Sequence, residues 1–128
     1  NRVNIINKNN LFPAEISGGM QKRVAIARAI AMNPKYLFCD EPNSGLDPVT
    51  AIVIDELIKE ITQEYQMTTV VITHDMNSVL EIGDNIMFIY EGRNKWVGDR
   101  NSILRTDVEE VNNFVYVSEF LRQFKEKL

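Results

Sequence analysis

The sequence predicts an α/β fold, with a mostly parallel sheet, flanking helices, and a C-terminal β-hairpin followed by a helix. Residues 36–39 and 67–73 form two short apolar runs with the length and side chains of strands. An amphipathic helical pattern lies between them, over residues 48–66. Because both runs are continuously apolar rather than alternating, we expect parallel strands that are buried on both faces of the sheet.

The composition is that of an ordinary globular protein. The 128 residues are 45% hydrophobic and 25% charged, which argues against wholesale disorder and fits one domain or part of a larger one. The net charge of −4 argues against general electrostatic binding to nucleic acid. The single cysteine, Cys39, cannot form an internal disulfide, which favours a reducing compartment.

No targeting or membrane segment is visible in the sequence. No apolar run approaches the roughly 20 residues that span a bilayer, and no signal peptide is recognisable. The first residue is Asn1 rather than Met, so we expect a piece of a longer protein.

The first predicted helix begins at Ser17. Residues 1–10 before it are interpreted as a loop or a frayed helix end, and Phe12-Pro13 interrupts any helix there. Ser17 suits the N-cap position. Gly18 and Gly19 allow a ligand to approach the first turn, where unpaired backbone N–H groups attract anions. A well-capped helix without a ligand explains these three residues equally when they are considered alone.

Two adjacent carboxylates, Asp40 and Glu41, follow the first strand. Open α/β sheets bind their ligands at the C-terminal ends of the strands. Adjacent strand residues point to opposite sides, so the two carboxylates can have separate roles. The alternative is that both are surface acids at a strand end.

The second helix is predicted to begin with Asp47 as N-cap and Pro48 in the first turn, and to end near Gln66. Asp47 is therefore expected to be a cap first, with any ligand contact additional. The predicted apolar positions are Val53, Ile54, Leu57, Ile58, Ile61 and Tyr65, and the predicted polar face holds Asp55, Glu56, Lys59 and Glu60.

The second strand is followed by His74, the single histidine of the chain. A lone histidine is usually structural or exposed, but its position at the C-terminal end of a parallel strand favours a functional role. Residues 76–82 are predicted to form a short helix that Gly83 closes in the C′ position.

The remaining chain predicts a hairpin and a long helix. Strands over residues 85–90 and 95–98 are joined by a turn at 91–94, with Trp96 as a half-buried anchor. A helical turn at 101–105 precedes the final helix. That helix is expected over residues 108–127, and its apolar positions are Val111, Phe114, Val115, Phe120, Leu121 and Phe124.

Four motifs in this order resemble the second half of the ATPase domain of ABC transporters. They are Ser17-Gly18-Gly19, Asp40-Glu41-Pro42, Ser44-Gly45-Leu46-Asp47 and Thr73-His74-Asp75. Singly they are modest, but together they are specific, and the match extends from about Phe12 to about Asp99. The resemblance implies a partial P-loop NTPase fold.

The resemblance also implies ATP and Mg²⁺ as cofactors and a role for each motif. Residues 16–20 are similar to the signature motif, which covers the γ-phosphate of ATP held by the opposite subunit of a dimer. Asp40 resembles the Walker B aspartate that holds Mg²⁺ through water, Glu41 the catalytic glutamate, and His74 the switch histidine. The implied ATP-binding residues are Ser17, Gly18, Gly19, Met20 and Asp47, the last in the D-loop.

By the same resemblance, residues 1–34 are the end of a helical subdomain, 35–99 the catalytic core, and 100–128 the C-terminal helices. The implied protein is a nucleotide-binding hydrolase subunit that couples ATP hydrolysis to transport. It would lie peripherally on the cytoplasmic face of the inner (cell) membrane, with a second ATPase subunit and transmembrane permease subunits as partners.

A finer resemblance concerns the branch of the family. The Ser-Gly-Gly-Met sequence, followed by Lys22-Arg23 and by Ala27-Arg28-Ala29, is similar to the ATPases of Mla/Mce-type transport. This resemblance implies phospholipid transport across a bacterial envelope. Two substitutions depart from the commonest signature, Ile16 for Leu and Met20 for Gln.

The sequence contains no G-x-x-x-x-G-K-[ST], the Walker A loop that cradles phosphates. We therefore expect the 128-residue chain alone to bind Mg-ATP very weakly and not to hydrolyse it. In the family, another strand lies between those at residues 67–73 and 85–90. Its absence would leave two strand edges unpaired, so we also expect the isolated chain to self-associate.

Two other functions remain open at this stage. One is the ATPase head of an ABC-type DNA-repair or chromosome-organising protein, whose long coiled coil would precede Asn1. The other is a non-catalytic module with the same fold. The presence of Asp40, Glu41 and His74 together argues against the second alternative, because a binding module has no chemical need for them.

Overall fold

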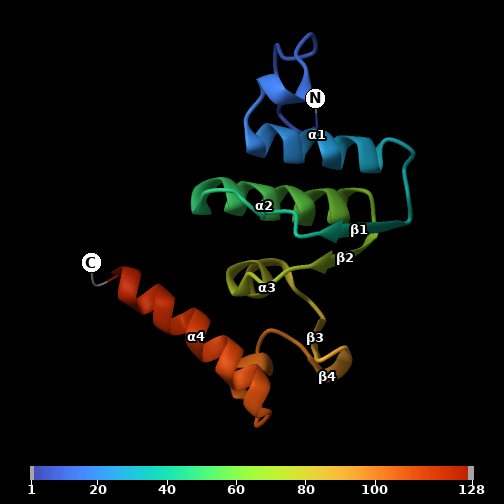
Figure 1. Cartoon of the computed structure of the whole chain (residues 1–128). Helices are drawn as coiled ribbons and strands as arrows, with labels where there is room; N and C mark the ends of the chain where they lie inside the picture. Colours follow the sequence, from blue (N-terminus) through green and yellow to red (C-terminus); the bar gives the residue numbers. More distant parts are fainter. Residues whose placement is uncertain (1, 127–128) are drawn as a thin grey trace. The chain divides into compact units, whose positions relative to one another are not determined.

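The computed structural model describes residues 2–126, excluding the side chains of residues 119–122 and 124–126 (Figure 1). Its contacts divide the chain into two compact units, Asn1–His74 and Asp75–Leu128. Each unit is described by itself below. The predicted apolar positions Phe120, Leu121 and Phe124 lie outside the described side chains.

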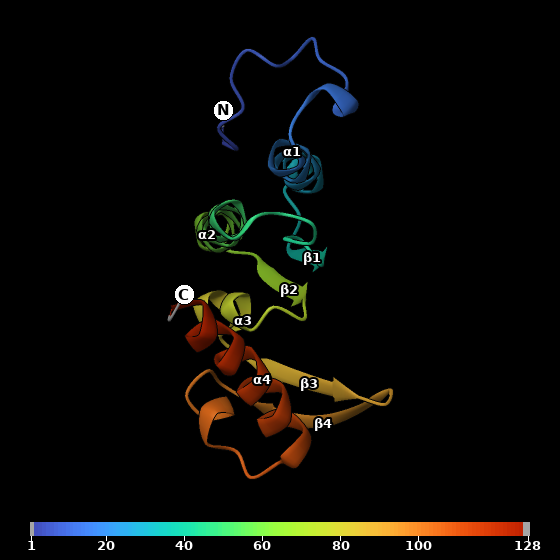
Figure 2. The same ribbon diagram turned by 60° about the vertical axis from the view of Figure 1, so that its left-hand side comes forward.

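The first unit combines two helices with two parallel strands. Its elements, in chain order, are η1 (Pro13–Glu15), α1 (Gly18–Ile30), β1 (Tyr36–Asp40), α2 (Pro48–Glu64) and β2 (Thr68–Ile72). Figures 1 and 2 show α1 and α2 running side by side next to the strand pair. Residues 2–10 contain no helix or strand, as predicted.

Strands β1 and β2 pair in parallel, with register from Tyr36 opposite Thr68 to Asp40 opposite Ile72. The prediction that both faces are buried is wrong for the described chain. Leu37 is 4% exposed, whereas its neighbour Phe38 is 72% exposed. Alternate residues point to opposite faces. One face is therefore covered within the unit, and the other, which carries Tyr36, Phe38, Val70 and Ile72, remains exposed.

The core of the first unit is the inner face of α2. Ile54, Ile58 and Ile61 are each at most 2% exposed. Asp55 departs from its predicted place on the polar face: it is 3% exposed, and the side-chain amide of Asn43 donates a hydrogen bond to it over 2.9 Å. The helix pattern alone could not reveal this, because the partner that makes burial of a carboxylate tolerable lies in a loop before the helix.

The second unit contains α3 (Met76–Ile82), β3 (Ile86–Tyr90), β4 (Arg93–Gly98), η2 (Ile103–Arg105) and α4 (Glu109–Glu126). Its core is formed by Met76, Ile103 and Val111, with Trp96 partly buried against them as predicted. The rings of Phe88 and Phe114 meet edge to face, with centroids 5.6 Å apart, which ties the hairpin to α4.

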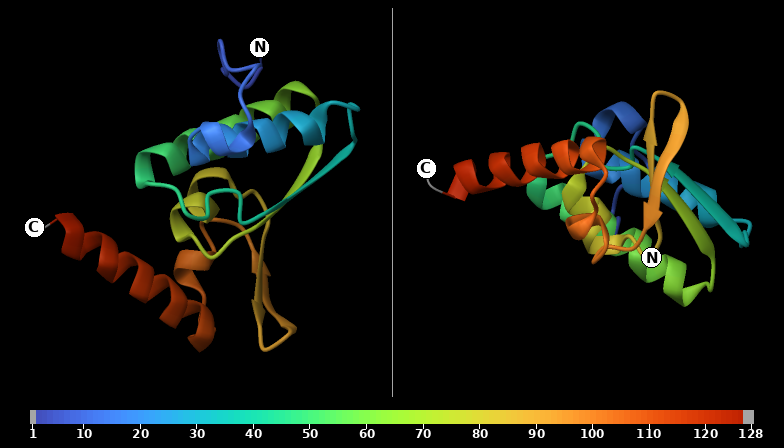
Figure 3. Two further views of the ribbon diagram at one scale, coloured as in Figure 1. Left: turned by 45° about the horizontal axis from the view of Figure 1, so that its top comes forward. Right: turned by 90° about the horizontal axis from the view of Figure 1, so that it is seen from below.

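Strands β3 and β4 form the predicted antiparallel hairpin (Figure 3), but its turn is shorter than expected. Only Glu91 and Gly92 lie between the strands, with φ of 48° and 72°. Two successive left-handed residues match the right-handed twist of a hairpin, and Gly92 adopts this conformation without steric cost. β4 therefore starts at Arg93, two residues earlier than the predicted four-residue turn allowed.

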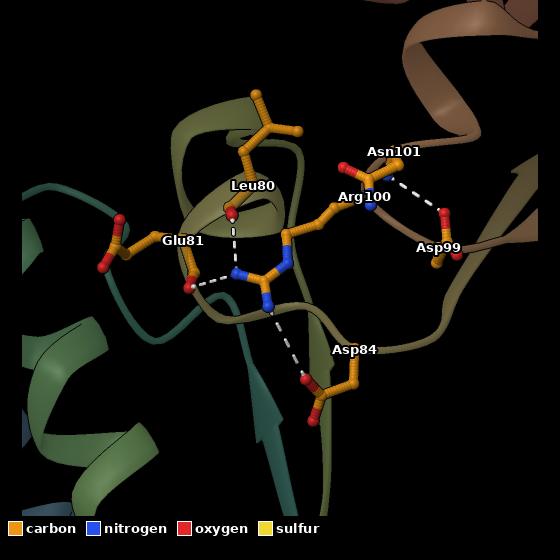
Figure 4. A network of polar contacts seen from close by, with 6 residues as sticks. All are labelled: Leu80, Glu81, Asp84, Asp99, Arg100 and Asn101. Carbon is orange, nitrogen blue, oxygen red and sulfur yellow. Dashed lines mark hydrogen bonds and ion pairs between the residues drawn. The ribbon is translucent and has the colours of Figure 1, made fainter.

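The end of α3 differs in mechanism from the prediction. Gly83 has φ of −76°, so it is not a left-handed C′ residue. A Cβ at Gly83 would instead lie 2.5 Å from the carbonyl oxygen of Val79, so glycine is required for space. The Arg100 guanidinium donates to the carbonyl oxygens of Leu80 and Glu81, each over 3.3 Å, and thereby satisfies the C-terminal end of α3 (Figure 4).

The described strands form two separate sheets of two strands each, β1-β2 and β3-β4. The α/β class, the parallel pair and the C-terminal hairpin with its helix are all as predicted. Among the helices of the described residues, none combines the length and the apolar character needed to cross a membrane.

Replacement of Ile54 by alanine tests the core of the first unit. We expect Ile54→Ala to lower the free energy of unfolding by about 2–5 kcal/mol, because it leaves a cavity at a fully buried position. Val53→Ala is the matched control: its side chain is 38% exposed, and it should cost less than about 1 kcal/mol. Urea unfolding followed by circular dichroism measures both, and equal losses would contradict the described packing.

Candidate functional site

The signature-like segment forms the N-terminus of α1, as predicted. The Ser17 hydroxyl accepts a hydrogen bond from the Met20 N–H over 3.2 Å, which makes Ser17 the N-cap. The backbone N–H of Met20 is therefore already hydrogen-bonded to the cap residue. The N–H groups of Gly18 and Gly19 belong to the first turn, where no intrahelical acceptor exists, and the helix dipole favours an anion there.

Gln21 is a residue of this segment that the sequence reasoning missed. Its side-chain amide donates to the carbonyl oxygens of Pro13, over 2.8 Å, and of Ile16, over 3.4 Å. These bonds hold the chain that leads into the helix. The only sequence signal was a glutamine two residues after the glycine motif, and its acceptors lie on backbone that no side-chain pattern identifies.

The two carboxylates lie at the C-terminal end of β1. Asp40 is the last strand residue and is exposed. Glu41 departs from the extended backbone expected for it, because its φ is 47°, in the left-handed region. Its N–H nevertheless donates to the carbonyl oxygen of Ile72 over 2.8 Å, so β2 still holds it. A left-handed glutamate is uncommon, and such strain concentrates at functional sites.

The structure brings Glu41 and His74 together. His74 Nδ1 lies 2.9 Å from Glu41 Oε1. An ionised carboxylate can only accept, so Nδ1 carries the proton in that state. The Glu41 side chain is 35% exposed and that of His74 is 78% exposed, so the pair faces solvent at the strand ends. The sequence placed each residue at the end of a strand but did not predict this hydrogen bond.

Asp47 caps α2, as predicted. Its carboxylate accepts from the Thr50 N–H over 3.0 Å and also from the Thr50 hydroxyl. These bonds hold the pKa of Asp47 below its usual range, and the bond from the Thr50 hydroxyl makes the largest contribution. The loop that leads to it turns at Gly45, where φ is 75°. Asp47 therefore remains ionised through the whole neutral range.

A buried pair supports the loop between Glu41 and Asp47. Asn43 is 9% exposed and Asp55 is 3% exposed, and they share the 2.9 Å hydrogen bond from the Asn43 amide. The sequence analysis did not identify Asn43, and it placed Asp55 on the polar face of the helix. The available signal was an acid two turns into the helix, next to apolar positions, but this pattern is equally typical of a solvent-facing residue.

The described residues contain no group of three His, Cys, Asp or Glu side chains arranged to hold a metal ion. Mg²⁺ is usually bound by one or two carboxylates together with phosphate oxygens and water. The exposed carboxylate of Asp40 at the end of β1 is chemically suited to that arrangement. By contrast, burial raises the pKa of the Cys39 thiol in the same strand, which keeps it protonated and unreactive.

A model of the ABC transporter family matches residues 1–44 of this chain. The methionine import ATP-binding protein MetN 3 of Pectobacterium atrosepticum is 47% identical over 91 residues, which are 71% of this chain and 26% of that protein. The probable ribonucleotide transport ATP-binding protein mkl of Mycobacterium leprae is 38% identical over 104 residues, or 81% of this chain and 30% of that protein.

Solved structures give the same result. A dimeric ATP-binding cassette, MJ0796 bound to ADP and Pi, superposes with a TM-score of 0.67 and 35% identity, over 77% of this chain and 43% of that one. The cassette MJ1267 of an ABC transporter superposes with a TM-score of 0.69 and 29% identity, over 79% of this chain and 42% of that one.

The chain thus spans between about a quarter and a third of the length of the curated relatives that it matches. Sequence and structure agree on the relationship, and the family model covers the glycine motif and the two carboxylates. This chain is homologous to the ATP-binding domains of ABC transporters.

Proposed function

We propose that this chain acts as the signature- and glutamate-bearing part of an ATPase subunit that drives an ABC transporter. The observation that carries the proposal is the 2.9 Å hydrogen bond between Glu41 and His74. It joins a carboxylate and an imidazole at the ends of two adjacent parallel strands, where such sheets hold their ligands.

The residues present fit Mg-ATP as the cofactor. Bound Mg-ATP would supply the phosphoryl group to be transferred and the charge that neutralises it. Asp40 would hold the metal through water, and the first turn of α1, with Ser17, Gly18, Gly19 and Met20, would receive phosphate oxygens. Asp47 would contribute from the D-loop while it caps α2.

Glu41 and His74 would carry the chemical step. The Glu41 carboxylate would orient the attacking water and accept its proton. His74 would fix the Glu41 side chain through Nδ1 and present Nε2 toward the phosphate. If Nδ1 donates to Glu41, a second donation from Nε2 requires the positively charged ring, because a neutral imidazole carries only one N–H.

The partners follow from the relatives. A second ATPase subunit, head to tail, is supported by the dimeric state of the cassette MJ0796. Permease subunits and a peripheral position on the cytoplasmic side of the membrane are supported by relatives named as import or transport ATP-binding proteins. The division of the chain at residues 34/35 and 99/100 belongs to the same proposal.

The transported substrate is less well supported. The Mla/Mce resemblance predicts a phospholipid, but the relatives are named for methionine import and for ribonucleotide transport, so their names lend lipid no support. We propose only that the chain serves a transporter. No observation on the described residues favours a DNA-repair ATPase or a non-catalytic module over this function.

Glu41→Gln in the complete subunit that carries these residues tests the proposed base. The amide keeps the size of the side chain but cannot accept a proton, so turnover should fall by about 10²–10⁴-fold while ATP binding is retained. Phosphate release measures turnover, and a fluorescent nucleotide measures binding. Glu56→Gln, an exposed acid of α2, is the control. Normal hydrolysis by Glu41→Gln would remove Glu41 from the mechanism.

His74→Ala in the same subunit tests the second member of the pair. We expect turnover to fall by about 10²-fold, because the variant loses both the support of Glu41 and a donor toward the phosphate. The melting temperature should change little, since the side chain is 78% exposed. A variant with full turnover would leave the Glu41–His74 hydrogen bond without a catalytic role.

Titration of the purified 128-residue chain with Mg-ATP tests whether these residues suffice. We expect binding weaker than about 1 mM, because the sequence supplies no Walker A lysine or loop. The mass in solution should exceed that of a monomer, since both strands of the β1-β2 sheet are edge strands. Tight binding would show that association completes a site, and a monomer at high concentration would contradict the expected association.

A further inference from the structure

Gly19 is buried against a side chain of another helix. It is one of two buried residues of α1, and the side chain that faces it is Thr50 of α2. A Cβ added at Gly19 would lie 2.5 Å from the Thr50 methyl carbon Cγ2. Carbon atoms in contact are normally about 3.5–4.0 Å apart, so any side chain at this position forces the Thr50 methyl group or the helices themselves to shift.

Backbone conformation does not explain this glycine. Gly19 lies within the first turn of α1, and its φ is not in the left-handed region that favours glycine. Nor is the side on which a Cβ would point open to a ligand, because Thr50 occupies it. Close approach of a ligand therefore accounts for Gly18, which is exposed, better than for Gly19.

The Thr50 methyl cannot easily turn aside. The Thr50 hydroxyl donates to one oxygen of Asp47, and the Thr50 N–H donates to the other over 3.0 Å. A β-branched side chain in a helix has few χ1 rotamers, and these bonds select one of them. The cap of α2 thus fixes the direction of the methyl group that meets Gly19.

A second contact joins the same two segments. A Cβ at Gly18 would lie 3.3 Å from Cδ2 of Leu46, the residue before Asp47. Two consecutive residues of the signature-like turn therefore face two residues at the start of α2. The segments that carry Ser17 and Asp47 meet within one chain and within one unit.

We propose that Thr50 is a positioning residue that locks the signature-like turn to the D-loop. Asp47 holds Thr50, and the Thr50 methyl group packs on Gly19, so the N-termini of α1 and α2 keep one relative position. This role rests on the proposed function, because it matters for turnover only if both segments serve the same ATPase reaction. It explains why residue 19 carries no side chain by a contact within the subunit, while the Gly19 backbone N–H stays available to phosphate.

A rescue experiment in the complete subunit tests the proposal. Gly19→Ala should lower ATP turnover by about 10²-fold, because a displacement of about 1 Å in a positioned group can cost that much. Thr50→Ser removes the methyl group but keeps the hydroxyl bond to Asp47, so alone it should lower turnover by about 5-fold, because the contact that positions the turn is weakened. The double variant should regain most of the lost turnover, to within about 5-fold of Thr50→Ser.

Gly18→Ala, with and without Thr50→Ser, is the matched control. Thr50→Ser should not rescue Gly18→Ala, since the neighbour of Gly18 is Leu46. All variants are assayed well below their melting temperatures, and turnover is expressed per folded subunit. A purely structural contact would change the melting temperature of the variants without changing their turnover per folded subunit.

The outcomes separate this inference from the proposed function. Full turnover by Gly19→Ala, or a double variant no better than Gly19→Ala, would overturn the positioning role. A wild-type subunit without ATPase turnover would refute the proposed function and the positioning role together. The melting temperatures of wild type, Gly19→Ala, Thr50→Ser and the double variant would then still test the contact. If the two single changes in melting temperature add up in the double variant, Gly19 and Thr50 do not meet.

Discussion

Burial of one face of α2 is the interaction on which the first unit depends. Ile54, Ile58 and Ile61 lose nearly all of their exposure, and removal of apolar surface from water is the main favourable term in folding. The same helix begins at the cap residue Asp47, which ends the loop that starts at Glu41. The burial that holds α2 in place therefore also holds Asp47, at one end of the candidate site.

The buried Asn43–Asp55 hydrogen bond extends this fixation into the loop. A carboxylate that is 3% exposed is costly unless it is hydrogen-bonded, and the Asn43 amide supplies such a bond over 2.9 Å. A loop that moved would break that bond and leave the buried Asp55 carboxyl less well satisfied. The position of the loop is thus coupled to the helix by electrostatics as well as by packing.

The parallel strands position the candidate site residues at their C-terminal ends. β1 carries Asp40 and leads into Glu41, while β2 leads to His74, and register alone makes the two strand ends neighbours. The left-handed backbone at Glu41 then turns its side chain toward His74, 2.9 Å away. Strain at one residue converts two separate strand ends into one hydrogen-bonded pair.

The sequence by itself determined the local features. Ser17 and Asp47 were recognisable as caps because their partners lie three residues away in the chain, and the order of four motifs identified the family. It also predicted the strands and helices nearly to the residue. These features depend on neighbours in sequence, so pattern and propensity suffice to find them.

Only the tertiary structure decided which surfaces meet. Continuous apolar runs showed that both faces of β1 are apolar, but not that Phe38 stays exposed within this chain while Leu37 is covered. The burial of Asp55 and the contact of Gly19 with Thr50 likewise join residues from separate elements. Such contacts depend on how the helices and strands pack. The sequence gives the chemical type of each residue, but it does not say which residue lies next to it in space.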